Sequence, residues 1–307
     1  MKPNAIRHIA VPLLAALIWG TAFVFQSLCA RSLPPFTVNA LRSFLAVGVL
    51  LPVSALRTGA LRRRGEAVPI DWRGLLRGSL VCGSFLFLGT GLQQMGIATT
   101  TAGKAGFITA FYVVLVPVFG IFLKKRVGAR VWFCVGLVAV GLWLLCIKAG
   151  ETLTVEPGDG LLIGCAVAYA CQVLSVDRFA QKLDSIRLSI GQFLVVGLFS
   201  GVLALLFERP TASGLHEALW PLLYIGVMSS GVAYTLQVVA QRGGNPTLVG
   251  LLLGMESVFS VLAGALILGD RLSGREYAGC AVMLAAVVLA QIPVEKMRRQ
   301  NPCTGGE

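Results

Sequence analysis

The amino-acid sequence predicts an all-α integral membrane protein, with ten transmembrane helices arranged as two inverted five-helix repeats. Three observations carry this prediction: the composition, the number of long apolar segments, and a weak similarity between the two halves. Of the 307 residues, 56% are hydrophobic and 13% are charged, and the mean hydropathy is +0.81. A soluble domain has about 25% charged residues. This chain therefore has more apolar surface than one soluble core can bury.

Ten segments are apolar and long enough to cross a bilayer, for which a helix needs about 20 residues. They span residues 9–29, 37–56, 74–94, 103–123, 131–148, 160–178, 188–207, 218–239, 247–268 and 276–292. The third and eighth are the weakest, because Gly, Ser, Thr and Gln interrupt them. The first segment resembles a signal peptide. However, SLCA (27–30) is a poor cleavage sequence and more spans follow, so we expect an uncleaved anchor.

Basic residues in the short loops predict the orientation. If the N-terminus is cytoplasmic, Lys and Arg residues on the inside outnumber those outside by about three to one. The acidic linker ETLTVEPGD (151–159) then lies outside. We therefore expect a multi-pass protein of a bacterial-type inner (plasma) membrane, with both the N- and C-termini in the cytoplasm.

The same linker divides the chain into a first repeat of helices 1–5 (residues 1–150) and a second of helices 6–10 (157–295), followed by a polar cytoplasmic tail (296–307). KRVGAR (125–130) aligns with DRLSGR (270–275), and a glycine-containing apolar span follows each. Because each half has an odd number of spans, the second half must enter the membrane upside down. Inverted repeats are typical of secondary transporters, which hold substrate near the midplane between the halves.

Several other functions lack support in the sequence. The net charge of +12 lies in short loops between apolar segments, so it indicates topology and no nucleic-acid partner. The eight cysteines form no CxxC pair and the two histidines lie far apart, so we predict no metal site. HExxH, Walker, GxSxG and GxGxxG motifs are absent from the sequence. We therefore predict no enzyme and no cofactor, and transport that uses a gradient, a partner or passive exchange.

Four motifs of the chain resemble those of a known family. They are WGTAF (19–23), PPFTVNALRSFLA (34–46), TAFYVVLVPVFGIFLKKRVGARVW (109–132) and NPTLVGLLLGMESVFSVLAGALILGDRLSGREYAGC (245–280). In their order and spacing the chain resembles EamA-type members of the drug/metabolite transporter superfamily. It departs from their pattern at Asp270, where Glu is usual, and at Lys125. The resemblance implies ten helices in two inverted repeats, and transport of small metabolites, commonly amino acids or their derivatives, often outward.

Glu256 lies about ten residues into the ninth span. A charge at the bilayer centre costs roughly 2.5–3.5 kcal/mol, so this side chain must point toward water or a partner. Two interpretations stay open. Glu256 binds a coupling proton or a substrate ammonium group, or it is a protonated or paired carboxylate that locks helices together.

Arg42, with Asn39 one turn before it, lies about two turns inside the outer end of the second span. Because arginine keeps its charge, it either anchors the turn after Pro34-Pro35 or binds a substrate carboxylate. An ion pair between Arg42 and Glu256 is an open alternative. Lys104 follows TTTAG at the outer mouth of the fourth span, where it attracts anionic groups or lies in solvent.

Aromatic residues with a polar tip are the remaining candidates for substrate contact, although interfacial belts and helix packing also use them. They are Trp19, Tyr112, Tyr169 and Tyr234. Five glutamines within spans are equally interpretable as interhelical hydrogen-bond partners or as ligands: Gln26, Gln93, Gln94, Gln172 and Gln237. Four GxxxG sequences, at 74–78, 160–164, 197–201 and 250–254, indicate a compact bundle.

We therefore expect a secondary transporter of small metabolites, amino acids or derivatives, that exports them by alternating access. An importer or exchanger of the same class is the alternative, and a non-transporting membrane protein is a more distant one. The expected partners are a small-molecule substrate and the lipid bilayer. A proton or another coupling ion, and a homo-oligomer, stay open.

Overall fold

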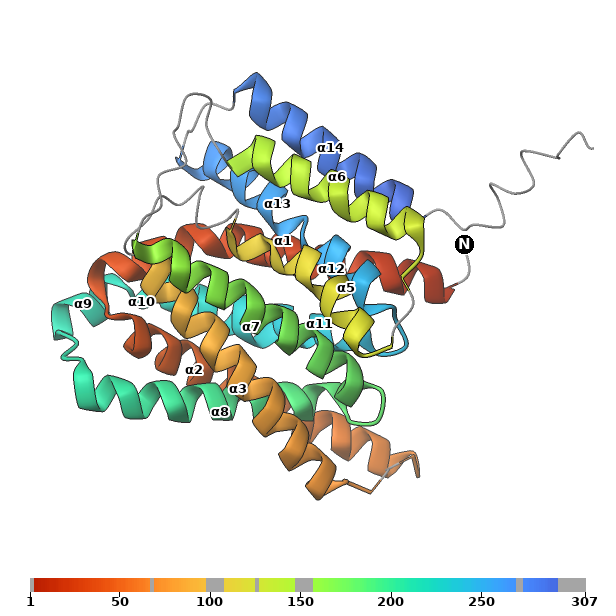
Figure 1. The fold of residues 1–307 in the computed structure, drawn as a ribbon. Helices are drawn as coiled ribbons and strands as arrows, with labels where there is room; N and C mark the ends of the chain where they lie inside the picture. The colour runs from red at the N-terminus through yellow and green to blue at the C-terminus, as the bar shows by residue number, and fades with distance from the viewer. Residues whose placement is uncertain are drawn as a thin grey trace, which may run out of the picture.

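The computed structural model describes residues 3–66, 69–97, 108–124, 127–146, 157–268 and 273–291, and within these ranges all regular secondary structure is helical (Figure 1). The helices are α1 (Pro3–Ser32), α2 (Pro35–Arg63), α3 (Trp72–Ile97), α5 (Tyr112–Phe122), α6 (Ala129–Cys146), α7 (Pro157–Ala180), α8 (Ser185–Phe207), α9 (Ala212–Glu217), α10 (Leu219–Tyr224), η1 (Ile225–Ala233), α11 (Tyr234–Gln241), α12 (Pro246–Leu253), α13 (Glu256–Ala263), η2 (Gly264–Leu268) and α14 (Gly274–Gln291). The elements η1 and η2 are π-helical.

Seven helical segments of the described chain are long and apolar enough to cross a membrane. They are Ile9–Ser32, Pro35–Arg63, Trp72–Ile97, Gly158–Ala180, Ser185–Phe207, Leu219–Gln241 and Pro246–Leu266. The third and eighth predicted spans, the weakest in sequence, are among them. Two further apolar helices, Ile108–Phe122 and Ala129–Leu145, are shorter. The all-α membrane class is therefore supported, whereas the ten-helix inverted repeat stays a prediction.

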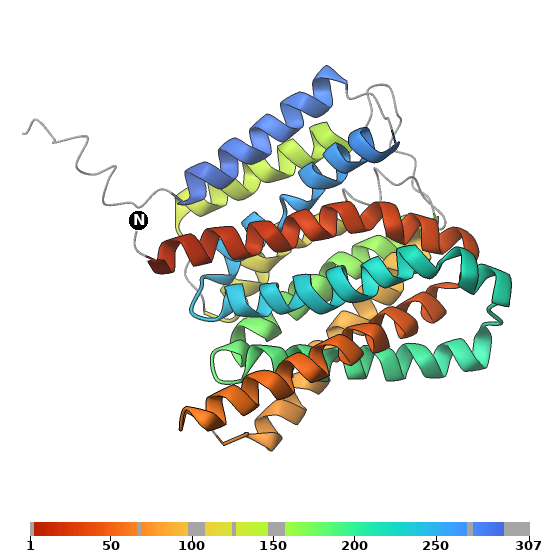
Figure 2. The same cartoon turned by 180° about the vertical axis from the view of Figure 1, so that it is seen from behind.

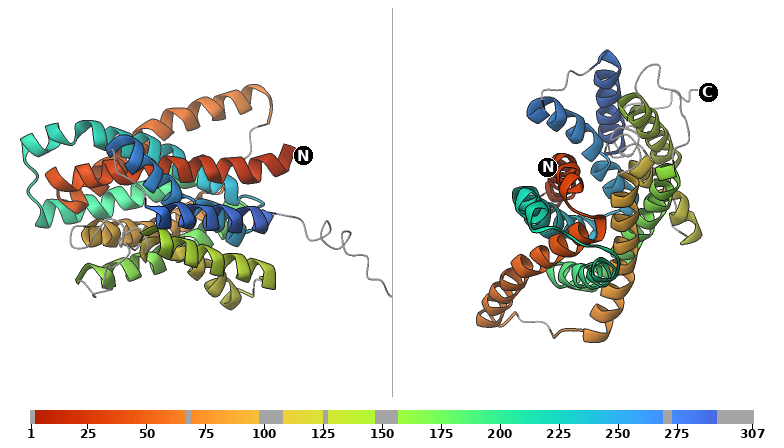
Figure 3. Two further views of the ribbon diagram at one scale, coloured as in Figure 1. Left: turned by 90° about the horizontal axis from the view of Figure 1, so that it is seen from above. Right: turned by 90° about the vertical axis from the view of Figure 1, so that its left-hand side faces the viewer.

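The helices form a bundle in which the chain runs back and forth between two ends (Figures 1 and 2). The α2–α3, α5–α6, α7–α8 and α11–α12 connections lie at one end, and η2 gives way to α14 at the other (Figure 1). Helices α6 and α14 pack side by side at one edge of the bundle, while α2 and α3 diverge at the opposite edge with α8 between them (Figure 3). The end of α5 and the start of α6 thus lie at one end of the bundle, and the end of η2 and the start of α14 lie at the opposite end, which is the relation that an inverted second half requires.

The outside of the bundle is apolar, as expected for a chain surrounded by acyl chains. Large hydrophobic side chains such as Leu205 and Phe122 are 88% and 81% exposed. Inside, polar side chains are buried together with apolar ones, among them Gln172, Gln192 and Arg42. In a bilayer such groups need partners within the protein or in a hydrated cavity. The interior is therefore where the functional groups of this chain lie.

Side-chain caps fix the ends of several helices. Glu208, after α8, accepts hydrogen bonds from the backbone N–H groups of Phe36 and Thr37 (2.9 and 2.7 Å) and from the Thr37 hydroxyl. A carboxylate here also complements the positive end of the α2 dipole. Asn245 caps α12 by accepting from the N–H groups of Thr247 and Leu248. These caps set the depth at which α2 and α12 present their side chains to the interior.

Candidate functional site

A central cavity of about 40 Å³ lies among seven helical segments of the chain and has room for a few water molecules. Six of the eight predicted site residues line it, each from a different helix: Trp19, Arg42, Tyr112, Tyr169, Tyr234 and Glu256. Asn39 is fully buried one turn from Arg42 and does not line the cavity. Lys104 lies outside the described residues, as do Lys125 and Asp270. The structure thus joins residues from both halves of the chain around one space.

Glu256 is placed by an interruption in its own helix. The α-helical ladder is broken at Gly254–Met255, where the Met255 and Ser257 N–H groups bond three residues back instead of four, and Glu256 begins α13. A carboxylate in the first turn of a helix is favoured by the helix dipole. Its side chain is 7% exposed and shares a hydrogen bond with the Tyr112 hydroxyl. Glu256 therefore faces the cavity and not the lipid.

Helix α1 packs directly against this interruption. Gly20 lies where α1 crosses the first turn of α13, and a methyl group there would be 2.8 Å from the Glu256 carbonyl oxygen and 2.5 Å from the Phe259 Cβ atom. Only glycine permits this distance without a shift of the backbone. The neighbouring Trp19 points into the cavity. The WGTAF sequence thus supplies two cavity-lining side chains, Trp19 and Phe23, and one close helix contact.

Arg42 is 3% exposed and lines the cavity from α2, and its Nε atom has no hydrogen-bond partner. Glu208, rather than Arg42, holds the turn after Pro34-Pro35. Both Arg42 and Glu256 belong to the described chain, and within it they form no ion pair with each other. A buried charge without a protein partner is costly. The guanidinium group is therefore available to an anion in the cavity.

Aromatic rings form part of the cavity wall. Trp19 and Phe193 both pack edge-on against Tyr234, with ring centroids 4.6 and 5.3 Å away. The Trp19 indole N–H donates to the Ser229 carbonyl (3.3 Å) within η1, whose widened turns are typical of π-bulges at functional sites. Tyr112 and Tyr169 lie edge-on at 6.2 Å. The walls are thus apolar on their faces, with hydroxyl groups at their edges.

Buried glutamines form a hydrogen-bonded chain at the cavity wall. Gln237 Nε2 donates to Gln172 Oε1 (3.1 Å), and Gln172 Nε2 donates to Gln192 Oε1 (3.3 Å). The Tyr169 hydroxyl donates to Gln93 Oε1 (3.1 Å). Of these residues, Gln93, Gln172 and Gln237 line the cavity, so the glutamines are both interhelical partners and wall residues.

Sequence reasoning missed some of the cavity wall. It did not single out Phe23, Thr109, Val173 or Ser229 as site residues, although all four line the cavity. Thr109 and Ser229 could have been found as small polar residues within apolar spans. Nothing in the sequence distinguishes Phe23 and Val173 from the many apolar residues that face lipid.

The EamA-like transporter family model matches this chain twice, over residues 7–147 and 156–291. The chain belongs to the EamA-like transporter family. The resemblance carried by the four motifs is thereby confirmed, and the protein is a membrane transporter of this family.

Curated EamA-like relatives match nearly the whole chain. An uncharacterized transporter of Archaeoglobus fulgidus is 27% identical over 92% of this chain and 84% of its own length. The threonine/homoserine exporter RhtA of Escherichia coli K12 is 25% identical over 96% of both chains. A solved crystal structure with 20% sequence identity has a TM-score of 0.76 over 96% of this chain and 98% of its own. At that identity the structure supports the fold alone.

Proposed function

We propose that this EamA-like protein exports small zwitterionic metabolites, with amino acids or their derivatives as the substrate class. In this proposal Arg42 binds the substrate carboxylate. Glu256 binds either the substrate ammonium group or a proton, so that the two compete for one carboxylate. Such competition would couple export of the substrate to entry of a proton.

The observation that carries the proposal is a pair of opposite charges that share a cavity without pairing. Arg42 and Glu256 are both more than nine-tenths buried, and they line one cavity without forming an ion pair within the described structure. A zwitterion presents complementary charges to both groups, which offsets the cost of burying each alone. The Trp19 and Tyr234 rings, which line the same cavity, fit the apolar part of such a molecule.

The size of the cavity supports alternating access. A space of about 40 Å³ holds a few waters but no amino acid, so the helices must separate to admit the substrate. The interruptions at Gly254–Met255 and in η1 lie on the helices that carry Glu256 and Tyr234. Broken helices around a midplane site are typical of secondary transporters. The similarity to a threonine/homoserine exporter supports the substrate class.

Counterflow in proteoliposomes tests the proposal. Vesicles that contain the purified protein and excess unlabelled threonine or homoserine should accumulate the labelled compound, whereas vesicles without protein should not. The carboxyl-free analogue of the substrate should fail to exchange. Exchange of the analogue at the same rate, or no exchange of any amino acid, would contradict the proposal. An imposed pH gradient then gives the direction of coupled flux.

A further inference from the structure

A second hollow, separate from the central cavity, lies at the end of the bundle where α2 ends and α3 begins. This end groove has a volume of about 580 Å³. It is lined by residues from the last turns of α2, from the start of α3 and from the α7–α8 turn, the last being Lys182, Leu183, Asp184 and Arg187. None of its lining residues lines the central cavity.

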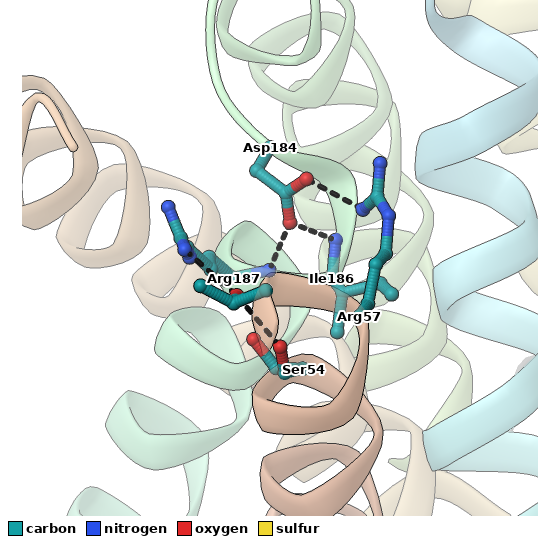
Figure 4. A network of polar contacts seen from close by, with 6 residues as sticks. Ser54, Arg57, Asp184, Ile186 and Arg187 are labelled. Carbon is teal, nitrogen blue, oxygen red and sulfur yellow. Dashed lines mark hydrogen bonds and ion pairs between the residues drawn. The ribbon is translucent and has the colours of Figure 1, made fainter. Parts of the chain in front are cut away.

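The two acidic side chains of the end groove, Asp71 and Asp184, both accept hydrogen bonds from backbone N–H groups. Asp184 accepts from the backbone N–H groups of Ile186 and Arg187 (3.1 Å each) and pairs with Arg57 at 2.6 Å (Figure 4). Asp71 accepts from the Gly74 N–H group at the start of α3 (2.9 Å). Asp184 is thus paired with Arg57, whereas Asp71 keeps its charge and makes no ion pair within the described chain. The two carboxylates therefore offset only part of the charge of the five basic residues that line the groove.

Three basic side chains of the end groove, Arg62, Lys182 and Arg242, are exposed and make no hydrogen bond or ion pair with any described residue. A fourth, Arg187, uses one guanidinium nitrogen to donate to the Thr58 hydroxyl (3.0 Å). The groove thus concentrates positive charge from three separate connections of the chain. Such a site attracts an anion.

The end groove also has apolar lining residues, which indicate the kind of anion that it binds. Of the residues that line the groove, Leu61 near the end of α2 and Trp72 and Leu75 at the start of α3 are apolar, and Trp72 is 67% exposed. In a membrane-spanning chain such side chains contact acyl chains, and tryptophan is enriched at the level of the lipid head groups. A soluble anion uses the basic residues alone, whereas a phospholipid uses both the basic and the apolar residues.

We propose that the end groove binds an anionic phospholipid, with its phosphate on Arg62 and Lys182 and its acyl chains over Leu61, Trp72 and Leu75. Basic pockets between transmembrane helices are suited to acidic lipid head groups. Bound there, the lipid joins α2 and α3 to the α7–α8 turn. It is a constituent of the folded transporter and not its substrate.

Native mass spectrometry of the delipidated full-length protein tests this proposal, with dioleoylphosphatidylglycerol and dioleoylphosphatidylcholine as probes. We expect the phosphatidylglycerol to be retained and the phosphatidylcholine to be lost. Replacing Arg62→Gln and Lys182→Gln together should weaken phosphatidylglycerol binding about 30-fold. The matched control, Arg31→Gln with Arg209→Gln, removes the same charge from exposed positions at the other end of the bundle and should change binding less than about twofold.

Three results would overturn the proposal: equal retention of both lipids, equal loss in both double variants, or displacement of the phosphatidylglycerol by inorganic phosphate, which would indicate a soluble-anion site. If the groove variant does not fold, thermal unfolding of the wild-type protein in the presence of each lipid tests the proposal instead. Phosphatidylglycerol should raise its Tm and phosphatidylcholine should not. Equal Tm values with the two lipids would also refute the site.

Discussion

At the residue scale, the arrangement of Arg42 distinguishes a ligand-binding charge from a structural one. A structural arginine would spend its five N–H donors on carbonyl groups or carboxylates. The Nε atom of Arg42 has no such partner, and the helix end that it was expected to anchor is held by Glu208. These contacts favour a role for Arg42 in the cavity over an anchor for the turn after Pro34-Pro35, and its binding of a substrate carboxylate stays a prediction.

Replacing Arg42→Gln should lower the affinity for the carboxylated substrate roughly 10- to 100-fold, because one charge-assisted hydrogen bond contributes about 1.5–3 kcal/mol. The measurement is the concentration dependence of counterflow. Arg31→Gln, at an exposed position, is the control and should leave it unchanged. If the two variants transport equally well, Arg42 does not bind the substrate.

Replacing Glu256→Gln should abolish the response of transport to a pH gradient, because a glutamine cannot take up or release a proton. It keeps the size of the side chain and a hydrogen-bonding group for the Tyr112 hydroxyl, so the fold should be retained. Flux is measured with and without an inside-acidic gradient. A variant that still responds to the gradient like the wild type would show that the proton is carried elsewhere.

At the scale of the helix, the close contacts follow the GxxxG sequences only in part. Gly160 and Gly250, each the first glycine of such a sequence, have open space at the position of a Cβ atom, whereas a Cβ atom on Gly78 or Gly254 would lie 2.9 Å from a side chain of another segment of the chain. Close approaches of one backbone to another also occur outside these sequences, at Gly20 on α1 and at Gly279, where α14 meets α6. A GxxxG spacing shows that a helix can approach another helix closely. Which glycine makes the contact depends on the partner helix and on the register between the two helices.

Replacing Gly20→Ala should destabilise the protein by about 1–3 kcal/mol, the typical cost of overpacking. The added methyl group meets the backbone of Glu256 and Ser260, which cannot rotate away. Thermal unfolding in detergent measures the effect. Gly48→Ala, with nothing within 4 Å, is the matched control and should be neutral. Equal Tm values for the two variants would mean that the α1–α13 contact is looser than described here.

At the scale of the whole molecule, the central question is whether the two halves have opposite orientations in the membrane. We expect a reporter fused after residue 127 to lie in the cytoplasm and one fused after residue 273 to lie outside. The reason is that the end of α5 and the start of α6 lie at one end of the bundle, and the end of η2 and the start of α14 lie at the other (Figure 1). Phosphatase and fluorescent-protein fusions give opposite signals on the two sides of the membrane. The same signal at both positions would exclude the inverted arrangement.

Much of the helical architecture could be predicted from the sequence, because hydropathy and length alone determine which segments can enter a bilayer. The weak third segment shows where this inference is least secure. Its glycines, serines and glutamines lower the hydropathy, yet α3 is still long and apolar enough to cross a membrane. Its polar residues Ser79, Thr90, Gln93 and Gln94 are buried inside the bundle. In the same way, composition identified Glu256 and Arg42 as costly in lipid, and so as residues that must face the interior.

What only the tertiary structure decided is which side chains meet. Hydropathy is a property of each segment alone, whereas a cavity depends on the register and rotation of helices from both halves of the chain. The sequence could therefore determine that Arg42 and Glu256 avoid lipid, but not that they share one space without pairing. The break before Glu256 and the crossing at Gly20 fix that register, because each sets where one helix backbone lies against another.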